Sequence, residues 1–286
     1  MSAAVIKTEA SQKRRNFISK FLIYFFLIVI TACMLLPFLW MLSSSFKLNK
    51  DVFGFPIQWI PKNPRWQNYV DIWTQIPLLT FVKNTVKITV VVTLLQLFTS
   101  SFAAYAFAKM QFKGKNALFL GYIATIAVPW QAYMVPQFMM MSSWHLNNTH
   151  LAIMCLQAFS AFGVFLMKQF SEGIPTEMLE AARIDGASEA RTFVKIVLPM
   201  VKPGIGALAI FTFINSWNDY FMQLIMLSST SNLTISLGIA KLQAENSTDF
   251  GLIMAGAALA AVPIIIIFLI FQKYFTKGIA MGAVKG

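Results

Sequence analysis

The segment Glu180–Pro199 reads EAARIDGASEARTFVKIVLP and differs sharply from the rest of the chain. Six of its twenty residues are charged, whereas 12% of the whole 286-residue sequence is charged and 57% is hydrophobic. A mean hydropathy of +0.65 and 27 Phe residues are typical of a protein that is solvated by lipid. We therefore interpret the chain as an integral membrane protein that exposes this polar segment at a membrane surface.

Long runs without charge predict the membrane helices around that segment. A helix that crosses a hydrocarbon layer of ~30 Å needs roughly 20 largely apolar residues. The uncharged interval Asn116–Met167 is too long for one crossing, and Pro129, Pro136 and the polar stretch Ser142–His150 divide it into two. The six predicted spans are Phe21–Leu42, Ile88–Ala108, the two parts of Asn116–Met167, Gly204–Leu227 and Gly251–Gln272.

The distribution of Lys and Arg predicts the orientation of these spans. With the N-terminus inside, 16 of the 23 Lys and Arg residues fall on the cytoplasmic side and 7 on the outer side. Both termini and Glu180–Pro199 are therefore expected in the cytoplasm. This asymmetry also explains the formal charge of +12, and because no surface motif of basic and aromatic residues accompanies it, we expect no nucleic-acid partner.

Local signals within the exposed segment predict two short helices joined by a sharp turn. Pro175 and Thr176 form a helix start, and Gly186 stands where a left-handed helix cap favours glycine. Ser188 can cap a second helix, which Pro199 stops or redirects as the chain returns to the membrane. The pattern indicates a helix, a turn and a helix on the cytoplasmic face.

Two interpretations of this helical segment remain open from its local pattern. The first is an amphipathic loop that rests on lipid headgroups. The second is a docking element, because a short helix is marginal by itself and could not bury its own apolar residues. Those residues are Met178, Leu179, Ala182 and Ile184.

The spacing of residues in the segment decides between these two interpretations. It follows the pattern E-A-A-x3-G-x9-I-x-L-P from Glu180 to Pro199. The chain resembles the permease subunits of type I bacterial ABC importers, and within the carbohydrate class it resembles the second, six-span permease of the maltose-type system. The resemblance extends to YAFAKMQFKGK at Tyr105–Lys115, SWNDY at Ser216–Tyr220 and GAVKG at Gly282–Gly286.

The resemblance implies an all-α polytopic membrane protein with the type I ABC importer permease fold, six transmembrane helices and both termini cytoplasmic. It implies the following organisation: a cytoplasmic tail (1-20), a first transmembrane helix (21-42), an external loop (43-78), an ABC type I transmembrane domain of five helices (79-275) with a cytoplasmic coupling loop (168-202), and a cytoplasmic tail (276-286).

The same resemblance assigns contacts with a separate ATPase. The coupling loop would dock into a cleft of that subunit, and the C-terminal tail would lie between two ATPases. The implied docking residues are Glu180, Ala181, Ala182, Arg183, Asp185 and Gly186, and the implied tail contacts are Ala283, Val284, Lys285 and Gly286.

Polar residues in the fifth predicted span are candidates for the substrate pathway. Polar groups at membrane depth mark functional sites, and an aromatic residue beside them suits stacking on a sugar ring. These candidates are Asn215, Trp217, Asn218 and Asp219. The alternative is that they lie at the outer end of the helix, where they cap it or pair with a neighbour.

The resemblance also implies the partners and the location. The partners would be a homologous second permease, two ATPase subunits, an external solute-binding protein, a sugar and membrane lipid, in a bacterial cytoplasmic membrane. The chain is expected to be a non-catalytic subunit without a bound cofactor, because it has no phosphate-binding loop and its ATPase partner would use ATP and Mg²⁺. His145 and His150 lack Cys or carboxylate partners for a metal site.

A secondary transporter driven by an ion gradient is the alternative function. Such carriers usually show repeated halves and several ionisable residues within their spans. Here Asp219 is the single carboxylate within a predicted span, and no half-to-half repeat is evident.

Overall fold

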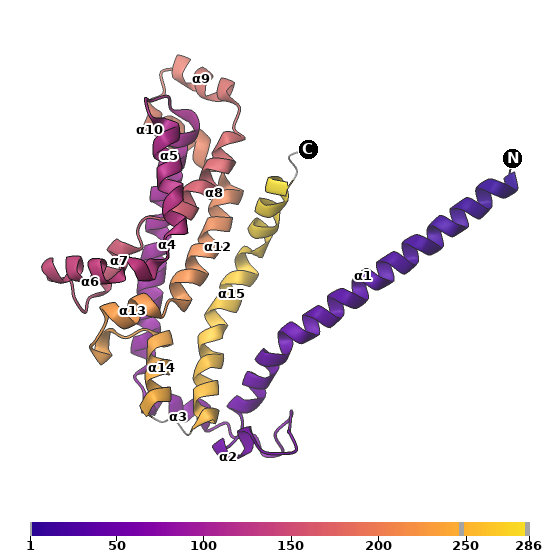
Figure 1. Cartoon of the computed structure of the whole chain (residues 1–286), viewed down its shortest axis with the longest axis vertical. Coiled ribbons are helices and arrows are strands. Elements are labelled where there is room, and N and C mark those ends of the chain that lie inside the picture. Colours follow the sequence, from indigo (N-terminus) through magenta and orange to yellow (C-terminus); the bar gives the residue numbers. More distant parts are fainter. Residues whose placement is uncertain (1, 246–248, 284–286) are drawn as a thin grey trace. The chain divides into compact units, whose positions relative to one another are not determined.

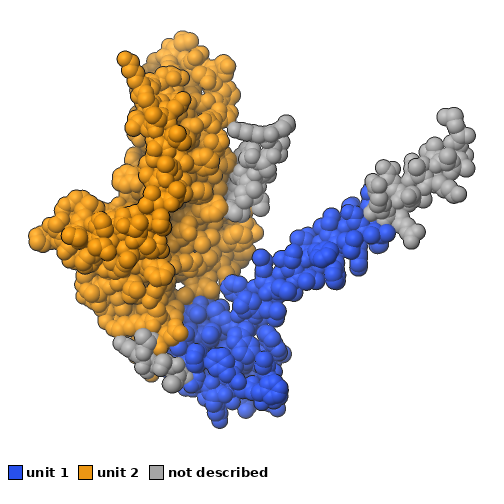
Figure 2. Space-filling model, viewed as in Figure 1, with its two compact units in different colours: residues 1–72, 247–258 blue, residues 73–246, 259–286 orange. Residues whose placement is uncertain are grey.

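A computed structural model describes residues 2–245 and 249–283, with side chains described over 16–243 and 249–272. Every regular element in these ranges is a helix (Figure 1). The chain divides into two compact units: residues 1–72 with 247–258, and residues 73–246 with 259–286 (Figure 2). The all-α fold class predicted from the sequence is confirmed.

The first unit contains a long N-terminal helix and a small folded region after it. Its elements are α1 (Ser2–Ser45), α2 (Asn49–Val52), the start of α3 (Asn68–Gln75) and the start of α15 (Phe250–Ala283). The side chains of α1 are exposed from Asn16 to Leu39, as expected of a helix that faces lipid. α1 ends where Asn68 Nδ2 donates to the carbonyls of Ser45 (2.9 Å) and Lys47 (3.0 Å), which no longer have helical partners.

The second unit is built around the uninterrupted helix α4 (Leu78–Lys109). α4 packs mainly against α8 (Ala161–Glu172) and α12 (Lys202–Asn218), which lie beside it (Figure 1). The other elements of the unit are α5 (Lys115–Ala124), η1 (Thr125–Ala127), η2 (Trp130–Ala132), α6 (Met134–Ser143), α7 (His150–Leu156), α9 (Thr176–Ile184), α10 (Glu189–Thr192), η3 (Phe193–Val197), α11 (Leu198–Met200), α13 (Phe221–Met226), η4 (Thr230–Asn232), α14 (Ile235–Glu245) and the later turns of α15.

Glycines allow the helices of this unit to approach closely, as Gly163 and Gly204 show. A Cβ at Gly163 of α8 would lie 2.4 Å from the Ser100 hydroxyl of α4, and a Cβ at Gly204 of α12 would lie 2.5 Å from the Phe170 ring of α8. Small residues let helix backbones approach in this way in membrane proteins. At one end of these helices the buried cluster is Ala104, Tyr105, Met167, Ile174, Leu179, Phe193, Val197, Val201 and Leu208.

The described helices only partly reproduce the predicted spans. Three unbroken segments are long and apolar enough to cross a membrane: Asn16–Ser45, Leu78–Lys109 and Phe250–Gln272. Two further candidates are bent pairs, α7 with α8 at 46° and Glu189–Met200 with α12 at 79°, which raises the number to as many as five. The count of six spans and the orientation of the termini therefore remain predictions.

Three predicted spans are interrupted, and one of them is the second part of Asn116–Met167, which the bend between α7 and α8 divides. The first part of Asn116–Met167 is divided into α5, two short 3-10 helices and α6, with a break at Pro129, which has no N–H to continue a helix. The predicted span Gly204–Leu227 is also not one helix, since α12 ends at Asn218 and α13 begins at Phe221.

Candidate functional site

The exposed segment identified in the sequence forms α9, a tight turn and α10. Gly186 has φ +74°, and the N–H groups of Gly186 and Ala187 donate to the carbonyls of Arg183 (3.0 Å) and Ala182 (2.9 Å). These two bonds form the Schellman arrangement that closes a helix at a left-handed glycine. The predicted left-handed turn at Gly186 is confirmed.

The second predicted helix also begins where its capping signal lies. Ser188 Oγ accepts from the N–H of Arg191 at 3.3 Å, and α10 starts at Glu189. The helix continues through the π-helical turn η3 and α11, which contains Pro199, and the chain then bends before α12. The chain is redirected as predicted, but the helix runs through Pro199 and the bend falls at Val201.

α9 has an inner face and an outer face. Leu179 and Ala182 are 1% and 8% exposed, whereas Met178 and Ile184 are 45% and 86% exposed. The expectation that all four apolar residues lack a place to pack is wrong for Leu179 and Ala182, because both are buried within the chain. The other implied docking residues, Glu180, Ala181, Arg183, Asp185 and Gly186, are all exposed.

Polar side chains of α4 hold the segment on both sides of α9. Tyr105 Oη donates to one carboxylate oxygen of Glu189 (2.5 Å), and Arg183 Nε donates to the other (2.8 Å). Lys109 Nζ donates to the carbonyls of Ile174 (2.5 Å) and Glu172 (3.2 Å). The hydrogen bond and the negative charge of Glu189 raise the pKa of the Arg183 guanidinium above its ordinary value.

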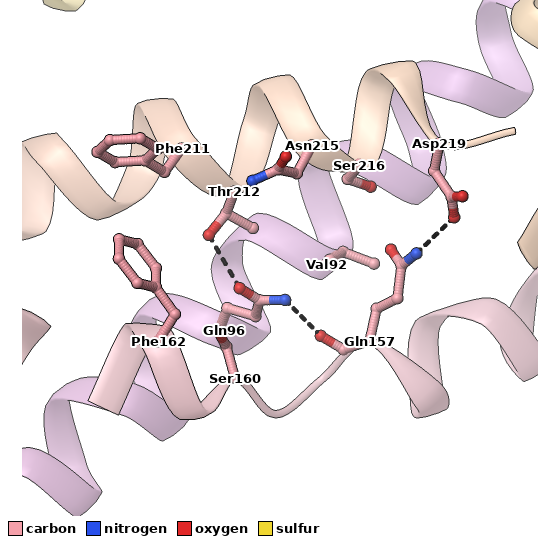
Figure 3. Close-up of a pocket in the computed structure, with 10 residues that line it drawn as sticks. All are labelled: Val92, Gln96, Gln157, Ser160, Phe162, Phe211, Thr212, Asn215, Ser216 and Asp219. Atoms are coloured by element: carbon pink, nitrogen blue, oxygen red, sulfur yellow. Dashed lines mark hydrogen bonds between the residues drawn. The ribbon is translucent and has the colours of Figure 1, made fainter. Parts of the chain in front are cut away.

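A polar cavity of about 350 Å³ lies among the bent helices of the second unit. Figure 3 shows that its lining comes from α4, from the junction of α7 with α8, and from α12 with the residues that follow it. The lining residues are Val92, Gln96, Gln157, Ser160, Phe162, Phe211, Thr212, Asn215, Ser216 and Asp219.

Hydrogen bonds across this cavity connect three helices. Gln96 accepts from the Thr212 hydroxyl (2.9 Å) and donates to the backbone carbonyl of Gln157 (2.8 Å). The Gln157 side chain in turn donates to Asp219 at 2.6 Å (Figure 3). Thr99 donates to the carbonyl of Ala158 at 2.8 Å. Side chains of α4 therefore satisfy carbonyls that the break between α7 and α8 leaves without helical partners.

Two of the four predicted pathway residues line the cavity and two do not. Asn215 and Asp219 line the cavity. Trp217 is 1% exposed and donates from Nε1 to the carbonyl of Ala260 (3.1 Å), so it packs away from the cavity. Asn218 is exposed and does not line the cavity. Ser216, which was not predicted, is 3% exposed with an Oγ that has no hydrogen-bond partner among the described residues.

Several residues of the polar cavity and of the contacts around α9 were not predicted from the sequence. The cavity residues Gln96, Gln157, Ser160 and Thr212 are uncharged polar residues within or beside apolar runs, a signal that a search for charges overlooks. The spacing of four residues between Tyr105 and Lys109 in YAFAK, which places both on one helix face, was also available.

Two other predictions concern the C-terminal tail and a metal site at the histidines. Val284, Lys285 and Gly286 lie outside the described residues, and Ala283 ends α15 without a described side chain. His150 Nε2 lies 2.9 Å from the carbonyl of Asn232. Over the residues whose side chains are described, no group of three or more His, Cys, Asp or Glu residues could hold a metal ion.

Apolar helices, bent pairs around a polar cavity and a glycine-capped exposed helix together define a helical membrane transport protein. The sequence matches the family model described as the binding-protein-dependent transport system inner membrane component over residues 10–281, and the chain belongs to that family. It is thus a permease component of an ABC importer, a non-catalytic membrane subunit.

Individual relatives agree with this assignment over nearly their whole length. The chain is 34% identical to the arabinooligosaccharides transport system permease protein AraQ of Halalkalibacterium halodurans, covering 87% of this chain and 91% of AraQ. It is 33% identical to the lactose transport system permease protein LacG of Rhizobium radiobacter, covering 87% and 90%.

A solved structure supports the fold. One chain of a bacterial ABC transporter for import of the acidic polysaccharide alginate matches with a TM-score of 0.79 and 24% identity, covering 92% of this chain and 98% of that one. At this identity the likeness bears on the fold alone.

Proposed function

We propose that the chain forms half of the translocation pathway of a carbohydrate ABC importer and couples that pathway to ATP hydrolysis by a separate ATPase subunit. The relatives named for arabinooligosaccharide and lactose transport support a sugar or oligosaccharide as substrate. Membership of the permease family favours this function over the ion-gradient-driven secondary transporter.

The observation that carries the coupling proposal is the two-faced construction of α9. Its inner face is fixed to the chain by buried Leu179, while its outer face leaves Ile184 86% exposed. The small side chain of Ala181 permits close approach of a partner, and the turn at Gly186 ends the helix abruptly. Such a short, anchored and protruding helix suits insertion into a cleft of another subunit.

The docking residues then divide into two roles. Glu180, Ala181, Arg183, Asp185 and Gly186 contact the ATPase from the exposed surface. Ala182 acts from the inner face, where it packs within the chain and its carbonyl accepts the Schellman bond. The tail residues Ala283, Val284, Lys285 and Gly286 add a second contact with the ATPases.

The polar cavity is the proposed part of the sugar pathway. Asn215, Gln157 and Asp219 offer amide and carboxylate groups that can replace the hydrogen bonds of sugar hydroxyls with water. Phe162 and Phe211, whose rings lie 5.4 Å apart, supply apolar surface beside them. Asn218 extends the path at the end of α12. Buried Trp217 fixes that end through its hydrogen bond to the carbonyl of Ala260.

The complete transporter would contain a second, homologous permease, two ATPase subunits that use ATP and Mg²⁺, and an external solute-binding protein. A second solved structure, with a TM-score of 0.64 and 16% identity, is of a bacterial alginate ABC transporter in complex with an alginate pentasaccharide-bound periplasmic protein. The permease would lie in a bacterial cytoplasmic membrane with six spans and both termini inside.

Co-purification with a matched pair of variants tests the docking proposal. Ala181→Trp adds bulk to the outer face of α9, and Ala190→Trp makes the same change at an exposed position of α10. The chain is produced with the ATPase and second permease from the same source and purified in mild detergent. Ala181→Trp should lose the ATPase and keep the second permease, whereas Ala190→Trp should keep both.

Equal retention of the ATPase by both variants would refute docking through this face. A wild-type chain that transports sugar alone, without an ATPase, would instead support the secondary transporter.

A further inference from the structure

Two residues at the C-terminal end of α4 contact the chain on both sides of α9. Lys109 binds the carbonyl of Ile174, which precedes α9, and Tyr105 binds Glu189, which follows it. The two side chains are four residues apart and lie on the same face of the helix. The segment that contains α9 is therefore attached to α4 before and after the protruding helix.

Packing reinforces these attachments. Leu179 of α9 belongs to the same buried cluster as Tyr105 of α4 and Phe193 of η3. The Tyr105 and Phe193 ring centroids lie 5.5 Å apart. Arg183, on α9 itself, is ion-paired with the same Glu189 that accepts from Tyr105. Because apolar packing and polar contacts involve the same elements, α9 has little freedom to move separately from the end of α4.

Earlier along the same helix, α4 contacts the cavity. Gln96 is bonded to the carbonyl of Gln157 and to Thr212, and Thr99 is bonded to the carbonyl of Ala158. Both carbonyls lie where α7 and α8 separate by a 46° bend. The Gln157 side chain then reaches Asp219 beyond the end of α12. Any displacement of Gln96 would change the shape of the cavity.

The stretch of helix between these two sets of contacts is suited to transmit a displacement. From Gln96 to Tyr105 the chain advances nine residues, or about 13 Å along an α-helix. The whole of α4 contains no Gly and no Pro, the residues at which helices usually kink. A displacement of α4 near Tyr105 and Lys109 should therefore also displace Gln96, because the helix between them bends little.

We infer that α4 is the element that carries motion from the docked loop to the sugar cavity, with Tyr105 and Lys109 as the positioning residues that fasten the loop to it. The inference rests on the proposed docking of α9 with the ATPase. When the ATPase moves α9, the contacts of Tyr105 and Lys109 draw α4 with it. Gln96 and Thr99 then shift the break between α7 and α8, and the amide of Gln157 moves relative to Asp219.

The test measures ATP-dependent opening of the cavity and needs no knowledge of the sugar. The complete complex, with its second permease and ATPases, is reconstituted in lipid nanodiscs. In this chain Cys33 and Cys155 are replaced by Ser, and Asn215→Cys places one thiol in the cavity. The rate at which a maleimide labels that thiol is compared without nucleotide and with ATP and vanadate.

Two variants of the contacts made by Tyr105 and Lys109, and one control variant, are compared in this assay. Tyr105→Phe with Lys109→Met removes both polar contacts and keeps most of the apolar side-chain surface. Tyr24→Phe with Lys113→Met makes the same two changes at exposed positions and is the matched control. Tyr105→Phe with Lys109→Arg restores a donor for the carbonyls of Ile174 and Glu172 and should recover part of the effect.

We expect the first double variant to retain the bound ATPase and its ATP hydrolysis, while the ATP-dependent change in labelling rate falls about fivefold, the lower range of allosteric coupling between sites. The control pair should behave as the unmodified reporter chain. A role limited to folding would instead lower the yield of assembled complex and leave the labelling change per complex intact.

Two outcomes would overturn the inference. One is an unaltered labelling change in the double variant; the other is loss of the ATPase from the complex, which would show that the contacts anchor the loop and do not transmit motion. If the double variant does not assemble, Lys109→Met alone is judged by the same two criteria. A wild-type chain that never binds an ATPase would overturn the proposed function itself.

Discussion

Replacement of Gly186 by valine should damage the turn between α9 and α10 through strain in its backbone. Gly186 has φ +74°, and a Cβ built there meets no atom within 4 Å, so the Cβ atom itself fits and the backbone conformation is the main obstacle. An L-residue in this left-handed conformation costs about 1–2 kcal/mol, and a β-branched residue lies at or above the upper end of that range. We expect a cost of about 2–3 kcal/mol for Gly186→Val.

That cost is similar to what holds the turn closed. The two Schellman bonds, from Gly186 to Arg183 and from Ala187 to Ala182, contribute about 1 kcal/mol each. The valine variant should therefore open the turn and fray the last turn of α9, which presents Ile184 and Arg183. The packing of α4 against α8 and α12 should be retained, because the contacts of these three helices with one another do not involve this turn.

Two further variants separate backbone strain from other effects. Gly186→Asn should be milder than Gly186→Val, because Asn tolerates the left-handed conformation better than other side chains do. Gly114 also has positive φ, +79°, and has no atom within 4 Å of its Cβ position, so Gly114→Val places the same strain in a different loop.

The assay is co-purification of the ATPase together with the ATP hydrolysis of the reconstituted complex. Gly186→Val should reduce both severalfold, Gly186→Asn should reduce them less, and Gly114→Val should leave them near the wild-type values. If Gly186→Val matches the wild type in both measurements, the geometry of this turn has no part in docking and the reasoning fails.

Three further predictions follow from other parts of the structure. Leu179→Ala should destabilise the second unit by about 2–5 kcal/mol because its side chain is 1% exposed, whereas Met178→Ala on the outer face should cost less than about 1 kcal/mol; equal shifts in thermal unfolding would contradict the two-faced description of α9. Asp219→Asn replaces a charged acceptor of the Gln157 hydrogen bond by a neutral one, which weakens that bond by about 1 kcal/mol, so sugar uptake should fall severalfold while ATPase co-purification is unchanged; unchanged uptake would remove Asp219 from the pathway. A thiol at Asn63→Cys should react with an impermeant reagent from outside the cell and one at Lys113→Cys only after the membrane is opened, and the reverse result would invert the predicted orientation.

Neighbouring residues determine several features of this protein by themselves. The left-handed turn at Gly186 and the cap at Ser188 depend on backbone sterics and hydrogen bonds within five residues, and both were predicted correctly. The spacing from Glu180 to Pro199 indicated the family that the comparisons establish over residues 10–281.

Only the tertiary structure decided how the helices combine. The bonds that join Tyr105 to Glu189 and Gln157 to Asp219 connect residues 84 and 62 positions apart in the chain. Such pairs depend on which helix faces meet. A lipid-solvated helix can be apolar all round, so its sequence does not mark the face that packs. The inward direction of Ala182 likewise depends on contacts with other segments, which local sequence patterns do not contain.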